Sequence, residues 1–370
     1  MTMVKLSFLL ALATSAAFAC SSPATEDPVP PLLPPPTTTG AQAPPPVADD
    51  AGALRLTCPK KAPFDTSIPG LVEQCTTRVL IAGLDRAVLK LSRDDGATWT
   101  DGAIDPAMPD AQSFNFATGY GVVAAMTRGG IYTSTDVKTW TRIPFAAGYN
   151  FNGAVTFADG RFASGGTGGT FGSADGVVWT GYRALERYPS GAVAGVDTFA
   201  VAFLGSQWIL AGRAENKGIV RTSKDGLAWS ESTNIGPQRS GAYSVASTKD
   251  HGVVVGAAGA ETEGVIARTT DGTVWADAVD KALGLRFVVS DGKRLVGFGQ
   301  NRTLTSTDGV AWTKLGDAPN LDGAVFAENL WFGRNESVYF VSADAVTWKA
   351  VLTPGGGNYL GSVGFARILK

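Results

Sequence analysis

The stretch Ser92-Arg93-Asp94-Asp95-Gly96-Ala97-Thr98-Trp99 occurs once in full in this 370-residue chain and six more times with one residue fewer. Each copy has a Ser or Thr, an Asp two residues later and a Trp at its end. Successive copies place these tryptophans 41, 39, 50, 46, 37 and 36 residues apart. A period near 40 residues indicates one supersecondary unit per repeat, either stacked or arranged in a ring. The six shorter copies contain Ser134, Asp136 and Trp140; Ser173, Asp175 and Trp179; Ser223, Asp225 and Trp229; Thr269, Asp271 and Trp275; Ser306, Asp308 and Trp312; and Ser342, Asp344 and Trp348.

Every copy stands between two runs that are typical of β-strands. Residues 130–133 precede the second copy and residues 218–221 precede the fourth, while the Trp belongs to the short run that follows. This pattern predicts a hairpin turn. Ser, Thr and Asp oxygens accept hydrogen bonds from turn N–H groups, and a glycine such as Gly96 supplies a positive φ. Trp offers a large apolar area that wedges between neighbouring sheets, so we expect all these residues to be structural.

The repeated phrase resembles the Asp-box, Ser-x-Asp-x-Gly-x-Thr-Trp, of sialidase-type β-propellers, which is also called the BNR repeat. The first copy matches every position, whereas the second and seventh have Val137 and Ala345 at the glycine. The resemblance covers roughly residues 78–370. It implies an all-β fold, a seven-bladed β-propeller of four-stranded blades. In that family the Asp-box lies at the blade periphery, away from the active face.

The ends of the chain predict how the ring closes. In the third repeat, runs at 151–157, 161–164 and 169–172 precede the strand of Trp179, which makes four strands. The first repeat has only two runs before its last strand, at 78–82 and 87–91, and an unassigned run at 360–366 remains near the C-terminus. We expect this run to complete blade one as its innermost strand, because such closure removes exposed sheet edges.

The N-terminus reads as a targeting segment. Lys5 is followed by an apolar stretch from Leu6 to Phe18, and Ala17-Phe18-Ala19 forms a small-x-small cleavage site before Cys20. We therefore assign residues 1–19 to a signal peptide. Cys20 at this place resembles a bacterial lipobox, which implies lipidation of Cys20. The Ser21 that follows implies the outer membrane, so we expect an exported protein of the bacterial cell envelope. Ordinary cleavage without lipid is the alternative.

Residues 20–50 read as the lipid-anchor Cys and a linker. Ten prolines lie between residues 21 and 50, a composition that favours disorder with polyproline II character. At about 3.1 Å per residue such a linker reaches up to about 90 Å. Residues 51–77 form a lead-in to the propeller at 78–370. Because the protein is exported, we expect Cys58 and Cys75 to form a disulfide, which contributes roughly 3 kcal/mol.

Composition excludes several function classes. A formal net charge of −2 gives no general attraction to nucleic acid or anionic lipid, so we expect membrane contact through the lipid anchor only. The chain has one histidine, His251, which we expect in a solvated turn. No acidic run has the spacing of a calcium loop, and the glycines at 165–169 do not open a helix as a nucleotide site requires. We expect no metal and no cofactor.

The functional face of a propeller is usually built from loops between blades and from loops between the second and third strands. Arginines recur in the second set. If they converge, they hold a carboxylate or sulfate by bidentate hydrogen bonds; otherwise they form a solvated polar rim. The candidates for binding are Arg86, Arg128, Arg213, Arg302 and Arg334.

A sialidase needs three Arg, a Tyr–Glu nucleophile pair and an Asp acid/base, with the first Arg in a Phe/Tyr-Arg-Ile-Pro motif ahead of the first box. Here Arg142-Ile143-Pro144 follows the second box instead. We therefore predict no catalytic residues and a non-catalytic binding or scaffold module for a protein or glycan, resembling sortilin-type receptors and photosystem II assembly-factor-like proteins. The alternatives are a sialidase-like glycoside hydrolase with its active site on the rim, marked by a deep pocket, and a purely structural envelope component.

Overall fold

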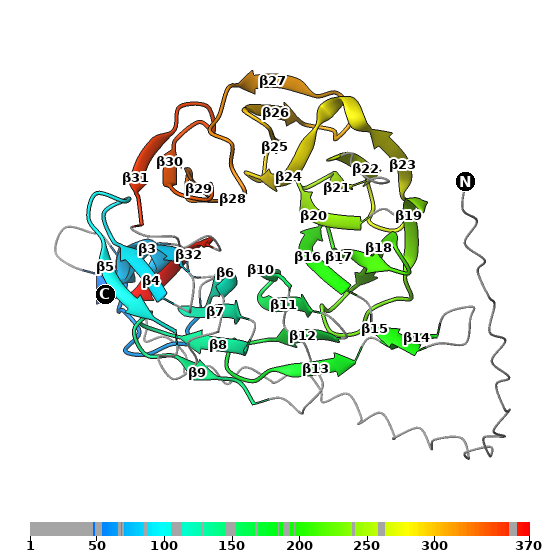
Figure 1. Ribbon diagram of the computed structural model, residues 1–370. Helices are drawn as coiled ribbons and strands as arrows, with labels where there is room; N and C mark the ends of the chain where they lie inside the picture. Colours follow the sequence, from blue (N-terminus) through cyan, green and yellow to red (C-terminus); the bar gives the residue numbers. More distant parts are fainter. Residues whose placement is uncertain are drawn as a thin grey trace, which may run out of the picture. The chain divides into compact units, whose positions relative to one another are not determined.

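The computed structural model describes residues 47–48, 54–65, 68, 70–84, 88–104, 113–127, 129–144, 153–166, 169–183, 185–187, 193–195, 197–238, 241–257, 263–354 and 361–370. Within residues 38–370, which form one unit, seven four-stranded antiparallel sheets are arranged as the blades of a ring (Figure 1). No helix among the described residues is long and apolar enough to cross a membrane. The predicted seven-bladed propeller of four-stranded blades is confirmed.

Each blade is a meander whose first strand is innermost and whose fourth is outermost (Figure 1). Blades one to four consist of β32 (Ser362–Leu369), β3 (Thr76–Gly83), β4 (Val88–Ser92) and β5 (Thr100–Ala103); β6 (Ser113–Gly119), β7 (Val122–Thr127), β8 (Gly130–Ser134) and β9 (Thr141–Arg142); β10 (Val155–Ala158), β11 (Arg161–Gly166), β12 (Gly169–Ser173) and β13 (Thr180–Arg183); and β16 (Asp197–Leu204), β17 (Gln207–Ala214), β18 (Lys217–Ser223) and β19 (Thr233–Gln238). Blades five to seven consist of β20 (Gly241–Ser247), β21 (Gly252–Ala257), β22 (Glu263–Thr269) and β23 (Ala276–Asp280); β24 (Leu285–Ser290), β25 (Leu295–Gly299), β26 (Arg302–Ser306) and β27 (Thr313–Gly316); and β28 (Gly323–Ala327), β29 (Leu330–Arg334), β30 (Tyr339–Ser342) and β31 (Lys349–Leu352). In every blade the box Trp lies before the outer strand, not within it as the sequence suggested.

The C-terminal strand closes the ring as predicted. β32 pairs antiparallel with β3 along its whole length, from Thr76 opposite Leu369 to Gly83 opposite Ser362. The order of this sheet is β32-β3-β4-β5, so the last strand of the chain is the innermost strand of blade one. The two ends of the propeller are thereby joined in one sheet, and β3 is paired on both of its sides.

Hydroxyl groups link neighbouring innermost strands. Thr156 Oγ1 in blade three donates to Val201 O in blade four at 2.8 Å. Between blades five and six, Ser244 Oγ donates to Val288 O at 3.2 Å and accepts the Val288 N–H at 3.1 Å. These bonds fix the inner strands relative to one another, which gives the ring a rigid centre.

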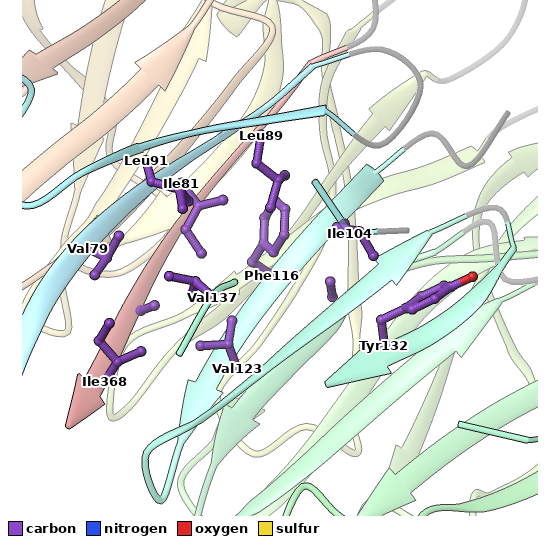
Figure 2. Close-up of a cluster of buried hydrophobic side chains, with 12 residues drawn as sticks. Val79, Ile81, Leu89, Leu91, Ile104, Phe116, Val123, Tyr132, Val137 and Ile368 are labelled. Carbon is purple, nitrogen blue, oxygen red and sulfur yellow. The ribbon is translucent and has the colours of Figure 1, made fainter. Parts of the chain in front are cut away.

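The hydrophobic core is divided into clusters that lie between adjacent blades. Figure 2 shows one of them, in which Val79 and Ile81 of blade one face Phe116, Val123 and Tyr132 of blade two. A box Trp joins the edge of each such cluster, as Trp140 does here. Since strand side chains alternate between the two faces of a sheet, each blade contributes to two clusters. The predicted wedging of Trp between sheets is seen in these contacts.

The lead-in contains a disulfide and is hydrogen-bonded to the propeller beside the closing strand. Cys58 and Cys75 form the expected disulfide, across 17 positions of sequence. Cys75 ends the short helix α1 (Leu71–Cys75) and is followed directly by β3. Its carbonyl accepts the Lys370 N–H at 3.0 Å, and the Phe64 N–H donates to Tyr120 O of blade two at 3.1 Å. The lead-in therefore contacts both the start and the end of the ring.

Five further short elements of the described residues lie outside the blades. β1 (Val47–Ala48) pairs with β2 (Leu54–Arg55), which lies near the start of the lead-in. A hairpin of β14 (Leu185–Arg187) and β15 (Val193–Gly195) occupies the connection between blades three and four, and the 3-10 turn η2 (Lys281–Leu283) that between blades five and six. The predicted signal peptide, Cys20 and the rest of the predicted linker lie outside the described residues.

Candidate functional site

The antiparallel order of each blade gives the ring two distinct faces. The box face carries the seven repeated turns between third and fourth strands, here called box turns, together with the turns between first and second strands. The loop face carries the turns between second and third strands and the connections from blade to blade. The described arginines among those predicted to bind, Arg213, Arg302 and Arg334, belong to the loop face.

The six shorter box turns are closed by the same side-chain hydrogen bonds. In the sixth, Ser306 Oγ donates to Asp308 Oδ1 at 3.0 Å and accepts the Gly309 N–H at 2.8 Å. The same Oδ1 accepts the N–H groups of Val310 and Ala311 at 2.8 and 2.9 Å. Equivalent bonds occur in the turns that begin at Ser134, Ser173, Ser223, Thr269 and Ser342. The carboxylates are therefore occupied in holding the backbone.

The first box turn is one residue longer and uses its Asp differently. Thr98 donates to Asp94 twice, from its N–H to Oδ1 at 2.9 Å and from its hydroxyl to Oδ2 at 2.6 Å. Trp99 Nε1 lies 3.1 Å from Gly96 O and 2.9 Å from Val351 O of blade seven. This turn consequently links blade one to the blade that precedes it in the ring.

The residue at the glycine position has a positive φ in all seven turns. The values run from 56° at Val137 to 89° at Gly96. A Cβ at Gly96 would also lie 2.9 Å from Val351 Cβ, so both conformation and space require glycine there. Val137 and Ala345, with φ of 56° and 65°, adopt the left-handed conformation despite their side chains, at a cost of about 1–2 kcal/mol each.

These hydrogen bonds stabilise the ionised form of the box carboxylates. The Thr98 hydroxyl, followed by the Thr98 N–H, lowers the pKa of Asp94 to about 2. The N–H groups of Val274 and Thr273 lower the pKa of Asp271 to about 2. At Asp225, burial raises the pKa, but the N–H groups of Ala228 and Leu227 outweigh it and the net shift is downward. Carboxyls held as anions in this way suit a structural role and not proton donation.

Charged side chains surround a depression of about 480 Å³ on the box face, at the seam where blades seven and one meet. Glu328 accepts hydrogen bonds from Arg367 Nε and, at 2.6 Å, from Arg367 Nη2. Arg78 Nη2 lies 2.5 Å from Asp95 Oδ1, and its Nη1 donates to Glu328 O at 3.2 Å. The depression is also lined by Arg93 and Asp94, so its three cations face three anions. We interpret this cluster as a set of ion pairs that joins blade seven to blade one.

The three described rim arginines predicted to bind lie in three different blades. Arg213 in blade four pairs with Asp197 at 3.1 Å. Arg302 in blade six donates to Ala282 O at 3.4 Å. Arg334 in blade seven is half-buried, and burial lowers the pKa of its guanidinium despite the opposing effect of Tyr339. The ion pair of Arg213 thus stays within blade four, and the hydrogen bond of Arg302 reaches the connection between blades five and six. Arg86 and Arg128 lie outside the described residues.

A recurrent irregularity of the inner strands supplies a different set of loop-face residues. The pairing of β6, β16, β20 and β24 with their second strands shifts by one residue near the loop-face end. A β-bulge of this kind turns a side chain out of the regular alternation, and bulges are frequent at functional sites. The residues skipped in the ladder are Phe114, Phe199, Tyr243 and Arg286. These residues occupy equivalent positions in blades two, four, five and six, but their side chains differ in chemistry.

The bulges of blades four and five bring two aromatic rings together. The centroids of Phe199 and Tyr243 are 5.2 Å apart with an interplanar angle of 44°. Tyr243 is 44% exposed, although it belongs to an innermost strand. Sequence reasoning missed this pair because residues 197–204 and 241–247 read as ordinary alternating strands. The available signal was an aromatic residue at the third position of two first strands.

Two ion pairs stand on either side of these rings. The pair of Arg213 and Asp197 lies in blade four, at the end of β16 that carries Phe199. On the other side, Arg286 of the blade-six bulge contacts Asp322 Oδ1 at 3.2 Å, just before β28 of blade seven. The side chains of Arg213 and Arg286 are 41% and 36% exposed. In the part of the loop face that the structure describes, the inner strands therefore carry two aromatic rings and two Arg–Asp pairs.

The remaining predictions concern metal binding and the Arg-Ile-Pro segment. Among the residues that the structure describes, no group of three His, Cys, Asp or Glu side chains is placed to hold a metal ion. His251 lies in the turn between β20 and β21 as expected, but it is half-buried, and its N–H donates to Thr248 Oγ1 at 3.1 Å. Arg142 lies at the end of β9 and donates to Gly129 O of its own blade at 2.9 Å.

Comparison with known proteins finds distant structural similarity only. No protein-family model matches the chain, and no curated protein matches its sequence. Apo AztD from Citrobacter koseri is 12% identical with a TM-score of 0.49, over 79% of this chain and 99% of that one. YCF48 bound to D1 peptide is 15% identical with a TM-score of 0.46, over 75% and 95%. A nidogen/laminin complex is 8% identical with a TM-score of 0.47, over 78% and 98%. All three TM-scores are below 0.5.

Proposed function

We propose that this protein is a binding or scaffold module without catalytic activity, and that it recognises a protein or glycan with its loop face. The observation that carries the proposal is the set of bulges, which places Phe199, Tyr243 and Arg286 at equivalent positions of neighbouring blades. A rigid repeated frame that presents dissimilar side chains is a suitable platform for recognition. The box turns, whose polar groups are already bonded to one another, support the frame.

The described carboxylates of this region favour binding over hydrolysis. A glycosidase needs two carboxyl groups on either side of one bond, within about 10 Å of each other. Asp197 and Asp322 stand in blades four and seven, and each is engaged by an arginine. The surface between them is aromatic. This arrangement suits contact with a ligand better than proton transfer to it.

The test is a glycan-array screen of the purified full chain, with a fluorogenic glycoside panel and crosslinking in bacterial envelopes run in parallel. We expect binding to a glycan or capture of a specific envelope protein, with no turnover of any glycoside. Turnover that is lost on substitution of Asp197 or Asp322 would replace the proposal with a hydrolase. Silence in all three assays would leave a purely structural component.

We further propose that the propeller belongs to the Asp-box group and is tethered to the outer membrane through a lipid on Cys20. The hydrogen bonds of the box turns support the first point, and the Ala17-Phe18-Ala19-Cys20 segment supports the second. Metabolic labelling with radioactive palmitate tests the anchor. We expect label in the wild-type chain and none in Cys20→Ser, whereas an unlabelled wild-type chain released to the soluble periplasm contradicts it.

A further inference from the structure

We propose that the paired rings of Phe199 and Tyr243, together with the flanking ion pairs, form a binding site for a neutral oligosaccharide. This inference rests on the proposed binding function and names its ligand class and site. The first observation is exposure: Tyr243 keeps 44% of its surface open on an otherwise buried inner strand. An aromatic face that is open to water binds the C–H face of a sugar ring, because both surfaces are apolar and flat.

The bulge explains why this surface is placed at the ring centre. In a regular strand the side chains of β20 alternate between the clusters on its two sides, as Val245 and Ala246 do. The ladder runs from Ala242 opposite Gly256 to Ser244 opposite Val255, and Tyr243 has no partner in it. Its ring also lies against Gly241, where an added Cβ would be 2.5 Å from Cζ. A glycine at this position therefore leaves space for the ring to lie along the strand end.

The charges around the rings select the kind of sugar. Among the described residues, the partly exposed Arg213 and Arg286 are paired with Asp197 and Asp322, respectively. Such a pair offers N–H donors and carboxylate acceptors together, which matches the hydroxyl groups of a sugar. An acidic ligand would have to displace an aspartate from its arginine. The site is therefore complementary to a polar ligand without net charge, and an acidic glycan is disfavoured.

The experiment compares variants of the full chain by calorimetric titration with the neutral oligosaccharides maltohexaose, cellohexaose and chitohexaose, plus any neutral array hit, and with the acidic 3′-sialyllactose. Tyr243→Ala is expected to weaken neutral-sugar binding about tenfold or more, and Tyr243→Phe to keep it within about threefold. Val274→Ala serves as the control, because Val274 is an exposed apolar residue on the box face. Unchanged thermal midpoints show that each variant is folded.

Salt dependence provides a second readout. Binding of a neutral sugar to neutralised ion pairs is expected to change less than twofold between about 0.05 and about 0.5 M NaCl, whereas binding of an acidic ligand weakens strongly over this range. Neutral-sugar binding that Tyr243→Ala leaves unchanged overturns the inference. A wild-type chain that binds only a protein or an acidic glycan also overturns it, while the proposed binding function stands. A chain that binds neither glycans nor protein overturns both.

Discussion

On the box face a Ser or Thr hydroxyl donates to an Asp carboxylate in all seven blades. On the loop face, equivalent bulge positions present Phe199 in blade four, Tyr243 in blade five and Arg286 in blade six. The box face repeats because each of its polar groups serves the turn that contains it. The loop face varies because nothing in the frame requires a given side chain there. Stability and recognition are thus assigned to opposite faces of the same blades.

Acid should have the largest effect on the box face, because it protonates the Asp carboxylates of many box turns at once. An Asp whose pKa is lower in the folded state contributes stability that is fully present above its unfolded pKa, about 3.9, and is lost as the pH falls toward the folded value. The pKa is about 2 for Asp94 and Asp271 and is also lowered at Asp136, Asp225, Asp308 and Asp344. We expect the urea midpoint to be constant from pH 7 to about pH 5 and to fall steeply toward pH 2.

A double variant shows whether the box turns cause this acid response. Replacing Asp94 and Asp271 by Asn should flatten the fall of the urea midpoint at low pH, since neither side chain then titrates. A matched double Asn variant of the exposed outer-strand residues Asp101 and Asp277 should keep the wild-type slope. A wild-type midpoint that stays level down to about pH 2.5 would show that the box carboxylates are not stabilised as anions.

Loss of a box Trp should be the largest effect of a single substitution. Trp348 packs against Phe298 of blade six, with ring centroids 6.1 Å apart, and donates to Ala345 O at 3.1 Å. Because the indole is partly buried, Trp348→Ala is expected to cost about 2–3 kcal/mol of unfolding free energy in urea. Tyr243→Ala on the loop face should cost about 0.5 kcal/mol or less. Equal losses in the two variants would remove the distinction between the faces.

Removal of one box carboxylate should have an intermediate effect. Asp308→Ala leaves the N–H groups of Val310 and Ala311 without their acceptor. The situation resembles loss of a helix N-cap, so we expect a cost of about 1 kcal/mol, measured by urea unfolding. Glu215→Ala, in the exposed loop-face turn after β17, is the control and should change stability by about 0.5 kcal/mol or less. A neutral Asp308→Ala would contradict the assigned role.

The two box turns without glycine allow the finest comparison. Ala345→Gly should relieve the left-handed strain at φ 65° and stabilise the fold by about 0.5–1 kcal/mol. Val137→Gly relieves the same strain but removes a fully buried side chain from the cluster in Figure 2, so it should destabilise by about 1 kcal/mol. Both values come from urea unfolding. A destabilised Ala345→Gly would mean that the strain is not what limits this turn.

Much of the frame follows from the sequence because its determinants are local and repeated. Box residues such as Asp308 form hydrogen bonds within their own turn. The unassigned C-terminal run could be placed only beside β3, because the first repeat lacked one strand. The disulfide followed from the two cysteines left after Cys20. The loop face did not follow in the same way. Whether Tyr243 pairs with the second strand of its blade depends on contacts with that strand and with the next blade. Arg286 contacts Asp322, which is 36 residues away in another blade.

The most direct test of the division between faces is amide hydrogen exchange of the full chain at neutral pH. If the box turns are part of the frame, the amides of Gly309, Val310 and Ala311 should exchange about 100-fold more slowly than those of Glu215 and Asn216 in the loop-face turn of blade four. Equal and rapid exchange in both turns would mean that the hydrogen bonds of the box turns do not persist in solution. The repeated phrase would then no longer account for the stability of the ring.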